Sequence, residues 1–393
     1  MSKHAVYVFH PNELLYRFND THPFDPARLV MTRDLLEKSD ALQAVQIRQP
    51  RIADESELLL VHTPEYIAAV KALSVDTPDT RALQDAERFG LITEDTPYFP
   101  GMHDITRQVV GGSIEAADIV MTGQADHALH LGGGLHHAMS NKGSGFCVYN
   151  DASVAIAHIR KQYGAKVLYV DTDAHHGDGV QWSFYHDPDV CTLSFHETGK
   201  YLFPGTGAVN ERGEGDGYGA CINIPVEPYT EDESWMEGFN EAMDRVVRHF
   251  QPDIIVSQHG CDAHALDPLA HVHCSMRIYK EMPQTIHRLA HQYCSGRWVA
   301  LGGGGYDIWR VVPRAWSMIW MTMSEHPLIE RLEQEPGLRL PKSWLSEWKT
   351  HSPLELPTTW LDDVSQWTPM PRRQEITENN RRTREVALLY VSH

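Results

Sequence analysis

The segment KVLYVDTDAHHGDG, residues 166–179, joins a predicted buried strand to a dense group of polar residues. Its first part, KVLYVD (166–171), is rich in β-branched and apolar residues, a pattern typical of a strand buried on both faces of a parallel sheet. Its second part, DTDAHHGDG (171–179), places three aspartates and two histidines within eight positions. In open α/β sheets ligands bind beyond the carboxyl ends of the strands. The segment therefore predicts both a fold and the place of a site.

Six further runs share this pattern of a short apolar stretch that ends in polar or glycine-rich sequence. They are AVYVF (5–9), HALHL (127–131), VCTLSF (190–195), CINIPV (221–226), DIIVSQ (253–258) and WVALGGGG (298–305). Helical patterns such as DASVAIAHIRKQYG (151–164) and DESWMEGFNEAMDRVVRHF (232–250) lie between them. Strands that alternate with helices predict an α/β fold with a doubly wound, mostly parallel sheet.

The length of 393 residues allows one large α/β domain with a tail, or two domains. The composition changes from about residue 335, where Pro, Trp and charged residues become frequent. We predict a single large domain over residues 1–330 and a tail over residues 331–393 that packs on it. The sequence of the tail contains no motif that assigns it a function.

Charge and cysteine content narrow the classes of function. The formal net charge of −19 disfavours binding to nucleic acid or to an anionic membrane surface. The six cysteines form no CxxC pair, which indicates reduced thiols in a cytoplasmic protein. The N-terminus lacks the features of a signal peptide, and no run reaches the ~18 apolar residues of a transmembrane helix.

Three groups of residues could carry chemistry. Alternation along a strand would point Asp171, Asp173 and His175 the same way, and Asp and His are good ligands for a divalent metal. The adjacent His136 and His137 follow a glycine run and would suit proton transfer. In HGCDAH (259–264) and GGGGY (302–306), the chemistry would come from Asp262 and Tyr306. Each group also has a structural alternative. The first could cap a helix, and His136 and His137 could be surface residues of a loop. Asp262 could be an N-cap, and Tyr306 could be a packed side chain.

Together these segments resemble the arginase-fold deacetylases, which comprise the histone deacetylases and, more similar still, the bacterial acetoin-utilisation proteins. The resemblance runs from about Tyr16 to Trp316. The anchors are HPFDPARL (22–29), LGGGLHHAMSNKGSGFCVYNDA (131–152), VDTDAHHGDGVQ (170–181), FPGTG (203–207) and LGGGGY (301–306). The resemblance implies an arginase/deacetylase fold whose catalytic domain is the large domain over residues 1–330.

The resemblance also implies a metal centre with catalytic residues around it. The implied metal ligands are Asp173, His175 and Asp262, which leave a position open for water and a substrate carbonyl. The implied catalytic residues are His136, His137, Asp171, Asp178 and Tyr306. In this scheme His137 moves protons, the two aspartates orient the histidines, and the tyrosine stabilises an oxyanion. His176 is expected to support the centre without binding the metal.

Further residues are expected to bind the substrate or other ions. The residues implied to bind substrate are Asp95, Gly145, Phe146, Phe203 and Leu269, with the two phenylalanines forming an apolar tunnel. Arg28 matches an arginine near a proposed acetate exit. Asp171 and Ser194 match a site for a structural monovalent cation, expected to be potassium.

The activity implied is the removal of acetyl groups from lysine side chains of a protein substrate, with zinc, or ferrous iron as the alternative metal. An acetylpolyamine deacetylase would carry an acid where this chain has Leu269. A dinuclear manganese enzyme of the arginase kind would need a second carboxylate where Ala263 and His264 follow Asp262. A non-catalytic acyl-lysine binding protein is the third alternative. The chain departs from its relatives at Leu266, and the roles of His264, His271 and His273 stay open.

Overall fold

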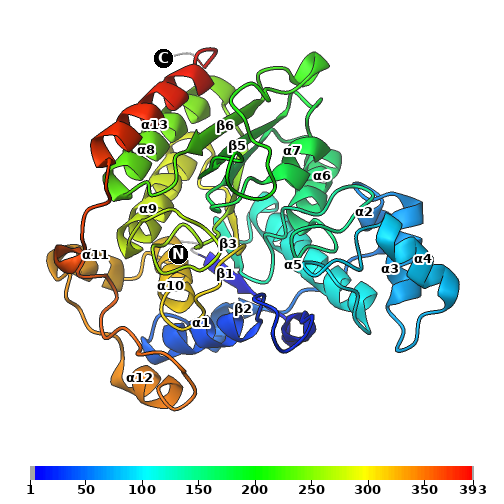
Figure 1. Cartoon of the computed structure of the whole chain (residues 1–393), viewed down its shortest axis with the longest axis horizontal. Helices are drawn as coiled ribbons and strands as arrows, with labels where there is room; N and C mark the ends of the chain where they lie inside the picture. Colours follow the sequence, from blue (N-terminus) through cyan, green and yellow to red (C-terminus); the bar gives the residue numbers. More distant parts are fainter. Residues whose placement is uncertain (1–4, 392–393) are drawn as a thin grey trace.

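The centre of the molecule is one parallel sheet of eight strands (Figure 1). The structure is a computed structural model and describes residues 5–391. The strand order is β2-β1-β3-β8-β7-β4-β5-β6, and all neighbouring pairs are parallel. The strands are β1 (Ala5–Val8), β2 (Ile47–Arg48), β3 (His127–His130), β4 (Val167–Asp171), β5 (Val190–Glu197), β6 (Cys221–Val226), β7 (Ile254–Gln258) and β8 (Trp298–Leu301). The prediction of a single-domain α/β fold with a parallel sheet is confirmed.

Helices cover both faces of the sheet, which explains why its strands are apolar throughout. In β4, Leu168 and Val170 pack into one core, whereas Val167 and Tyr169 pack into the core on the opposite face. The first core is closed by α1 (Ala27–Lys38), α8 (Asp232–Phe250), α9 (Met276–Tyr293) and α10 (Val312–Met323). The second is closed by α5 (Met102–Met121), α6 (Asp151–Tyr163) and α7 (Asp178–Ser183).

Short helices complete the N-terminal part of the chain. They surround a third core, whose largest side chains include Tyr66, Phe89 and Phe99. These helices are α2 (Glu55–Leu58), α3 (Pro64–Leu73) and α4 (Thr80–Arg88). The 3-10 turns η1 (Pro11–Leu15) and η2 (Ala44–Gln46) also belong to the N-terminal part of the chain. The short turn η3 (Gly215–Gly217) lies before β6.

One strand was not predicted. Strand β2 has only two residues at the edge of the sheet, with Ile47 half-buried and Arg48 exposed. A two-residue edge strand carries no apolar run, so no pattern in the sequence could identify it. The predicted helices over 151–164 and 232–250 correspond to α6 and α8.

The C-terminal residues wrap around the domain and contribute to its core. Helix α12 (Lys342–Trp348) packs on α1, where the Trp344 indole donates to the Met31 carbonyl at 3.1 Å. Helix α13 (Arg373–Ala387) packs on α8 and β6 (Figure 1). The remaining elements are α11 (Leu328–Gln334) and η4 (Val364–Gln366). The predicted boundary between domain and tail at 330/331 falls within α11 and stays a prediction.

All six cysteines are buried and unpaired. Within residues 5–391, the longest helices are too polar or too short to cross a lipid bilayer.

Candidate metal and catalytic centre

Four adjacent central strands, β3, β8, β7 and β4, end at the same edge of the sheet. Because all four are parallel, the segments that follow them meet there. His136 follows β3, Asp173 follows β4, Asp262 follows β7 and Tyr306 follows β8. Strand β4 ends at Asp171, so the expected strand alternation of Asp171, Asp173 and His175 does not continue beyond it. Only the latter two join the cluster of candidate ligands.

Asp173, His175 and Asp262 form this cluster, and all three are buried. His175 Nδ1 lies 3.1 Å from Asp173 Oδ1 and 2.9 Å from Asp262 Oδ2. One imidazole nitrogen carries a single proton or a single lone pair, so it cannot make two good hydrogen bonds. Donor atoms around a tetrahedral zinc ion are ~3.3 Å apart, because zinc–nitrogen and zinc–oxygen bonds are ~2.0–2.2 Å long. The three side chains therefore fit a divalent metal.

The charge and shape of the cluster support the same interpretation. Two carboxylates and one imidazole leave a net negative charge in a buried place, which is costly without a cation. Gly304 lies against the cluster, where a Cβ atom would come within 2.2 Å of Asp262 Oδ2. The backbone therefore leaves space beside the carboxylates that any larger residue would fill.

Two residues that support this cluster were not predicted. Gln258, the last residue of β7, donates through Nε2 to Asp173 Oδ2 at 2.8 Å. The carboxylate of Asp267 accepts from the backbone N–H of Tyr306 at 2.7 Å and so holds the tyrosine loop. A polar residue that ends a buried strand was a usable signal for Gln258. No local pattern pointed to Asp267, since its partner lies 39 residues away.

The two adjacent histidines lie beside the cluster, each bonded to its own aspartate. His136 Nδ1 donates to Asp171 Oδ2 and His137 Nδ1 donates to Asp178 Oδ1, both at 2.7 Å. Their ring centroids are 4.0 Å apart. Each Nδ1 proton is thus committed to a carboxylate, which leaves the Nε2 atoms for other chemistry.

The two imidazoles have opposite pKa shifts. Burial, followed by the charge of His136, lowers the pKa of His137 to about 4. Burial alone would also lower the pKa of His136, but the charges of Asp171 and Asp173 outweigh it and raise the pKa to about 9. These shifts favour a neutral His137 and a protonated His136. A cation bound beside Asp173 would offset the charge of that carboxylate and so would lower the pKa of His136 again.

A cavity of about 210 Å³ leads from the surface to this centre. Phe203, which is 43% exposed, stands at its mouth, and its ring lies 5.0 Å from that of His137. Phe146 packs edge-on against Tyr306 at 5.6 Å. At Gly145 a Cβ atom would lie 2.5 Å from the ring of His137, so only glycine fits between this wall and the histidine. The residues that line the cavity are Asp95, His137, Gly145, Phe146, His175, Leu202, Phe203, Leu269 and Tyr306.

All five residues expected to bind substrate thus line one cavity, and Leu202 is an addition that was not predicted. Arg28 is buried and donates through Nη1 to the carbonyls of Gly303 and Gly305 at 2.8 and 3.2 Å. It therefore holds the glycine loop that carries Tyr306. Ser194 pairs with Asp171 across β4 and β5, so the two residues expected at a monovalent cation are neighbours.

The other histidines near the centre are bonded elsewhere. His176 uses both ring nitrogens, on Thr206 Oγ1 at 2.8 Å and on Gln181 Oε1 at 2.9 Å, which agrees with a supporting place. His264 bonds to the tail through Asp362 Oδ2 at 2.8 Å, and His271 bonds to Glu197. The ring of His273 packs on Trp367. Because His264 is bonded to the tail, it does not form a second metal site beside Asp262.

Comparison with known proteins agrees with this geometry. The sequence profile described as "Histone deacetylase domain" matches residues 22–323. Acetoin utilization protein AcuC of Bacillus subtilis is 50% identical over 98% of this chain and 97% of its own length. AcuC of Staphylococcus aureus strain MSSA476 is 44% identical over 97% of this chain and 95% of its own length.

Solved structures show the same fold. An HDAC homologue from Aquifex aeolicus superposes with a TM-score of 0.82 at 25% identity, and the match covers 97% of this chain and 100% of that one. An HDAC homologue complexed with SAHA matches to the same extent. The chain therefore belongs to the histone deacetylase family of metal-dependent enzymes.

Proposed function

We propose that this protein is a zinc-dependent lysine deacetylase that removes acetyl groups from a protein substrate. One observation carries the proposal: an apolar-walled cavity ends at His175, His137 and Tyr306. The apolar wall suits the methylene chain of an acetyl-lysine, and the polar end suits its amide. Because its relatives are named acetoin utilization proteins, we place the substrate in that process. We also propose that the protein acts in the cytoplasm.

The metal would be held by Asp173, His175 and Asp262. When bound, the ion polarises a carbonyl and lowers the pKa of a water molecule to ~7. Two oxygen ligands and one nitrogen ligand suit zinc and ferrous iron alike, so we retain iron as the alternative. A potassium ion beside Asp171 and Ser194 remains part of the proposal.

His137 would move the protons of the reaction. As a neutral imidazole with Nδ1 fixed on Asp178, it can accept the proton of the attacking water on Nε2 and return it to the departing lysine amine. His136, held by Asp171, would act mainly through electrostatics. Accordingly, His137→Ala should lose nearly all turnover but keep its metal, and His136→Ala should be less impaired. The reverse ranking would exchange the two roles.

Tyr306 would donate a hydrogen bond to the oxyanion. Burial, followed by the negative charges of Asp262 and Asp173, raises the pKa of its hydroxyl well above the ordinary value. The hydroxyl therefore keeps its proton at neutral pH and can donate it to a carbonyl oxygen that becomes negative.

The rim of the cavity favours a peptide over a polyamine. Leu269 offers no counter-charge for a secondary ammonium, and Asp95 is exposed beside it, where it can accept hydrogen bonds from a peptide backbone. The formal net charge of −19 makes nucleic acid and anionic membranes poor partners. An acetylated protein is the partner that fits this surface best.

Substrate preference tests the proposal. The zinc-loaded and iron-loaded enzymes would be compared on acetyl-lysine peptides, longer acyl-lysine peptides and acetylspermidine. We expect the highest kcat/KM on an acetyl-lysine peptide, and Leu269→Glu should shift preference toward acetylspermidine. Leu266→Glu is a matched control, because Leu266 is 37% exposed and lies outside the residues that line the cavity. A wild-type kcat/KM that is higher for acetylspermidine than for every peptide would contradict the proposal.

A further inference from the structure

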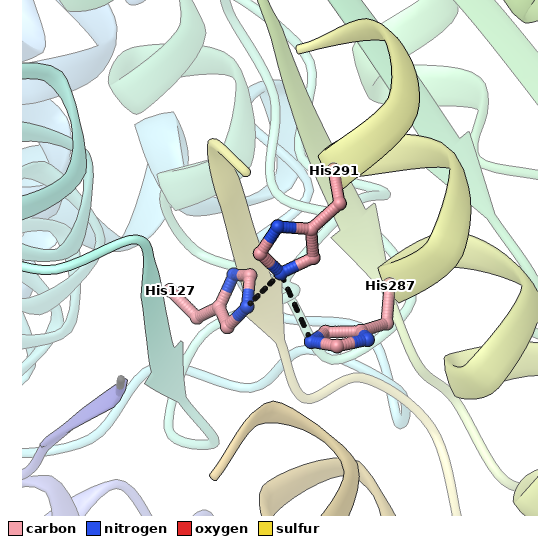
Figure 2. Close-up of side chains that lie close together, drawn as sticks. All are labelled: His127, His287 and His291. Atoms are coloured by element: carbon pink, nitrogen blue, oxygen red, sulfur yellow. Dashed lines mark hydrogen bonds between the residues drawn. The ribbon is translucent and has the colours of Figure 1, made fainter. Parts of the chain in front are cut away.

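A second cluster of side chains lies away from the cavity. His127 is the first residue of β3, and His287 and His291 lie one turn apart on α9. Figure 2 shows the three rings pointing toward one another, one from the strand and two from the helix. His127 opens its strand, so the cluster lies at the amino end of β3, whereas the candidate catalytic residues follow the carboxyl ends. The two sites are therefore at opposite edges of the sheet.

The distances suit a metal ion better than a set of hydrogen bonds. His291 Nε2 lies 3.2 Å from His127 Nε2 and 3.2 Å from His287 Nε2 (Figure 2). One imidazole nitrogen has a single proton or a single lone pair, so it can make only one good hydrogen bond in the plane of its ring. Three nitrogens around a tetrahedral zinc ion would be ~3.3 Å apart, given zinc–nitrogen bonds of ~2.0–2.1 Å. All three ligand atoms lie within 4.8 Å of one another.

The spacing of the helical pair supports the same conclusion. Residues four apart on a helix project from the same face, and two histidines at this spacing form a recurrent zinc-binding pair. His127 approaches this pair from the sheet and supplies a third nitrogen. Three imidazoles leave one coordination position, which a water molecule can fill.

Burial lowers the pKa of two of the three imidazoles, His127 and His287. Burial, followed by the charges of His287 and His291, lowers the pKa of His127 to about 3. Burial, followed by the charge of His291, also lowers the pKa of His287, and the opposing charge of Glu325 is a smaller effect. A lowered pKa favours the neutral imidazole, which is the form that binds a metal.

The surroundings close the cluster on one side and leave it accessible on the other. Trp298, which pairs with His127 across β3 and β8, packs against it with ring centroids 5.6 Å apart. His127 is buried, His287 is half-buried and His291 is exposed, so an ion could enter from solvent. Gly296 lies beside His291, where a Cβ atom would come within 3.2 Å of the imidazole ring.

We propose that His127, His287 and His291 bind a divalent transition metal of the zinc class, as a structural site that ties α9 to β3. This site is separate from the proposed catalytic metal and does not depend on the proposed activity. Its expected effect is on stability, because an ion that binds only the folded chain raises the melting temperature.

The test compares zinc content and melting temperature in the full chain. Wild type, His291→Ala and the control His351→Ala would be equilibrated with buffered zinc, and bound zinc would be measured by plasma mass spectrometry. His351 is an exposed histidine whose ring bonds to its sequence neighbours Thr350 and Glu347, so it serves as the matched control. We expect His291→Ala to carry one zinc fewer per chain than either comparison protein and to gain less melting temperature from zinc.

Turnover at saturating zinc should be the same in all three proteins, because the cluster lies at the opposite edge of the sheet. His287→Ala should repeat the loss of one zinc. Both substitutions are on the solvent side of the cluster, so the fold should tolerate them. Equal zinc content and equal zinc-induced stabilisation in wild type and His291→Ala would overturn the proposal, whatever the total zinc content.

Discussion

Gly304 offers a steric test of the candidate metal centre. A Cβ atom at this position would lie 2.2 Å from Asp262 Oδ2 and 2.8 Å from Asp173 Oδ2, whereas real Cβ atoms essentially never approach closer than 3.0 Å. Gly304→Ala must therefore displace at least the Asp262 carboxylate by about 0.8 Å. Its backbone is not in the left-handed region, so alanine adds bulk without conformational strain.

The expected result is a folded protein with a damaged centre. Overpacking of this size costs about 1–3 kcal/mol of stability, which a large domain can tolerate. Misplacement of a reacting group by ~1 Å can reduce a rate about 100-fold, so we expect a loss of that order in kcat/KM together with weaker metal retention. Gly337→Ala is the matched control, because a Cβ atom there meets nothing within 4 Å.

Deacetylation of an acetyl-lysine peptide, bound zinc and thermal unfolding would be measured on the three proteins. We expect Gly337→Ala to match wild type in all three measurements. If Gly304→Ala kept wild-type zinc and turnover, the two carboxylates would not be the ligands of a catalytic ion.

Two further predictions concern other parts of the molecule. Tyr306→Phe should lower kcat by ~10²–10³ and leave peptide binding largely intact, because the hydroxyl acts mainly in the transition state. Steady-state kinetics and a binding assay would measure the two effects. A near-normal kcat would show that the tyrosine does not stabilise the oxyanion. Asp362→Asn should lower the free energy of unfolding by about 3 kcal/mol at pH 7 in urea titrations, because it leaves the buried Arg314 without its ion pair at 2.9 Å. Burial alone would raise the pKa of Asp362, but His264 and Arg314 outweigh it and hold the pKa below the ordinary value. The ion pair therefore adds its full stabilisation above the unfolded-state pKa of ~3.9, and this stabilisation is lost as the pH falls through the folded-state pKa. The difference in free energy of unfolding between wild type and Asp362→Asn should shrink below pH ~4. A difference that stayed constant there would contradict the role of the ion pair.

Much of the fold could be predicted because its strands are buried on both faces. In β4, the side chains on both faces of the strand pack into cores, so the run 167–170 is apolar without interruption and is easily recognised. The edge strand β2 has one half-buried and one exposed residue, so the same reasoning had nothing to detect there.

The candidate site was predictable to the extent that strand ends define it. Asp173 and Tyr306 follow strands that end at one edge of the sheet, so their convergence follows from parallel topology alone. Asp267, which holds the tyrosine loop, lies in a connecting segment, and its role depends on the packing of that segment. Strand alternation failed beyond Asp171 because the strand itself ends there.

The sequence by itself determined the fold class and the family resemblance, and the resemblance implied the five predicted residues that line the cavity. The fold class follows from local patterns, namely continuous apolar runs and the polar segments directly after them. Only the tertiary structure decided which distant side chains meet. It brought His264 to Asp362 across 98 residues of chain and His127 to His291 across 164. The physical reason is that a contact between distant segments depends on strand order, register and helix packing, which no local pattern of residues records.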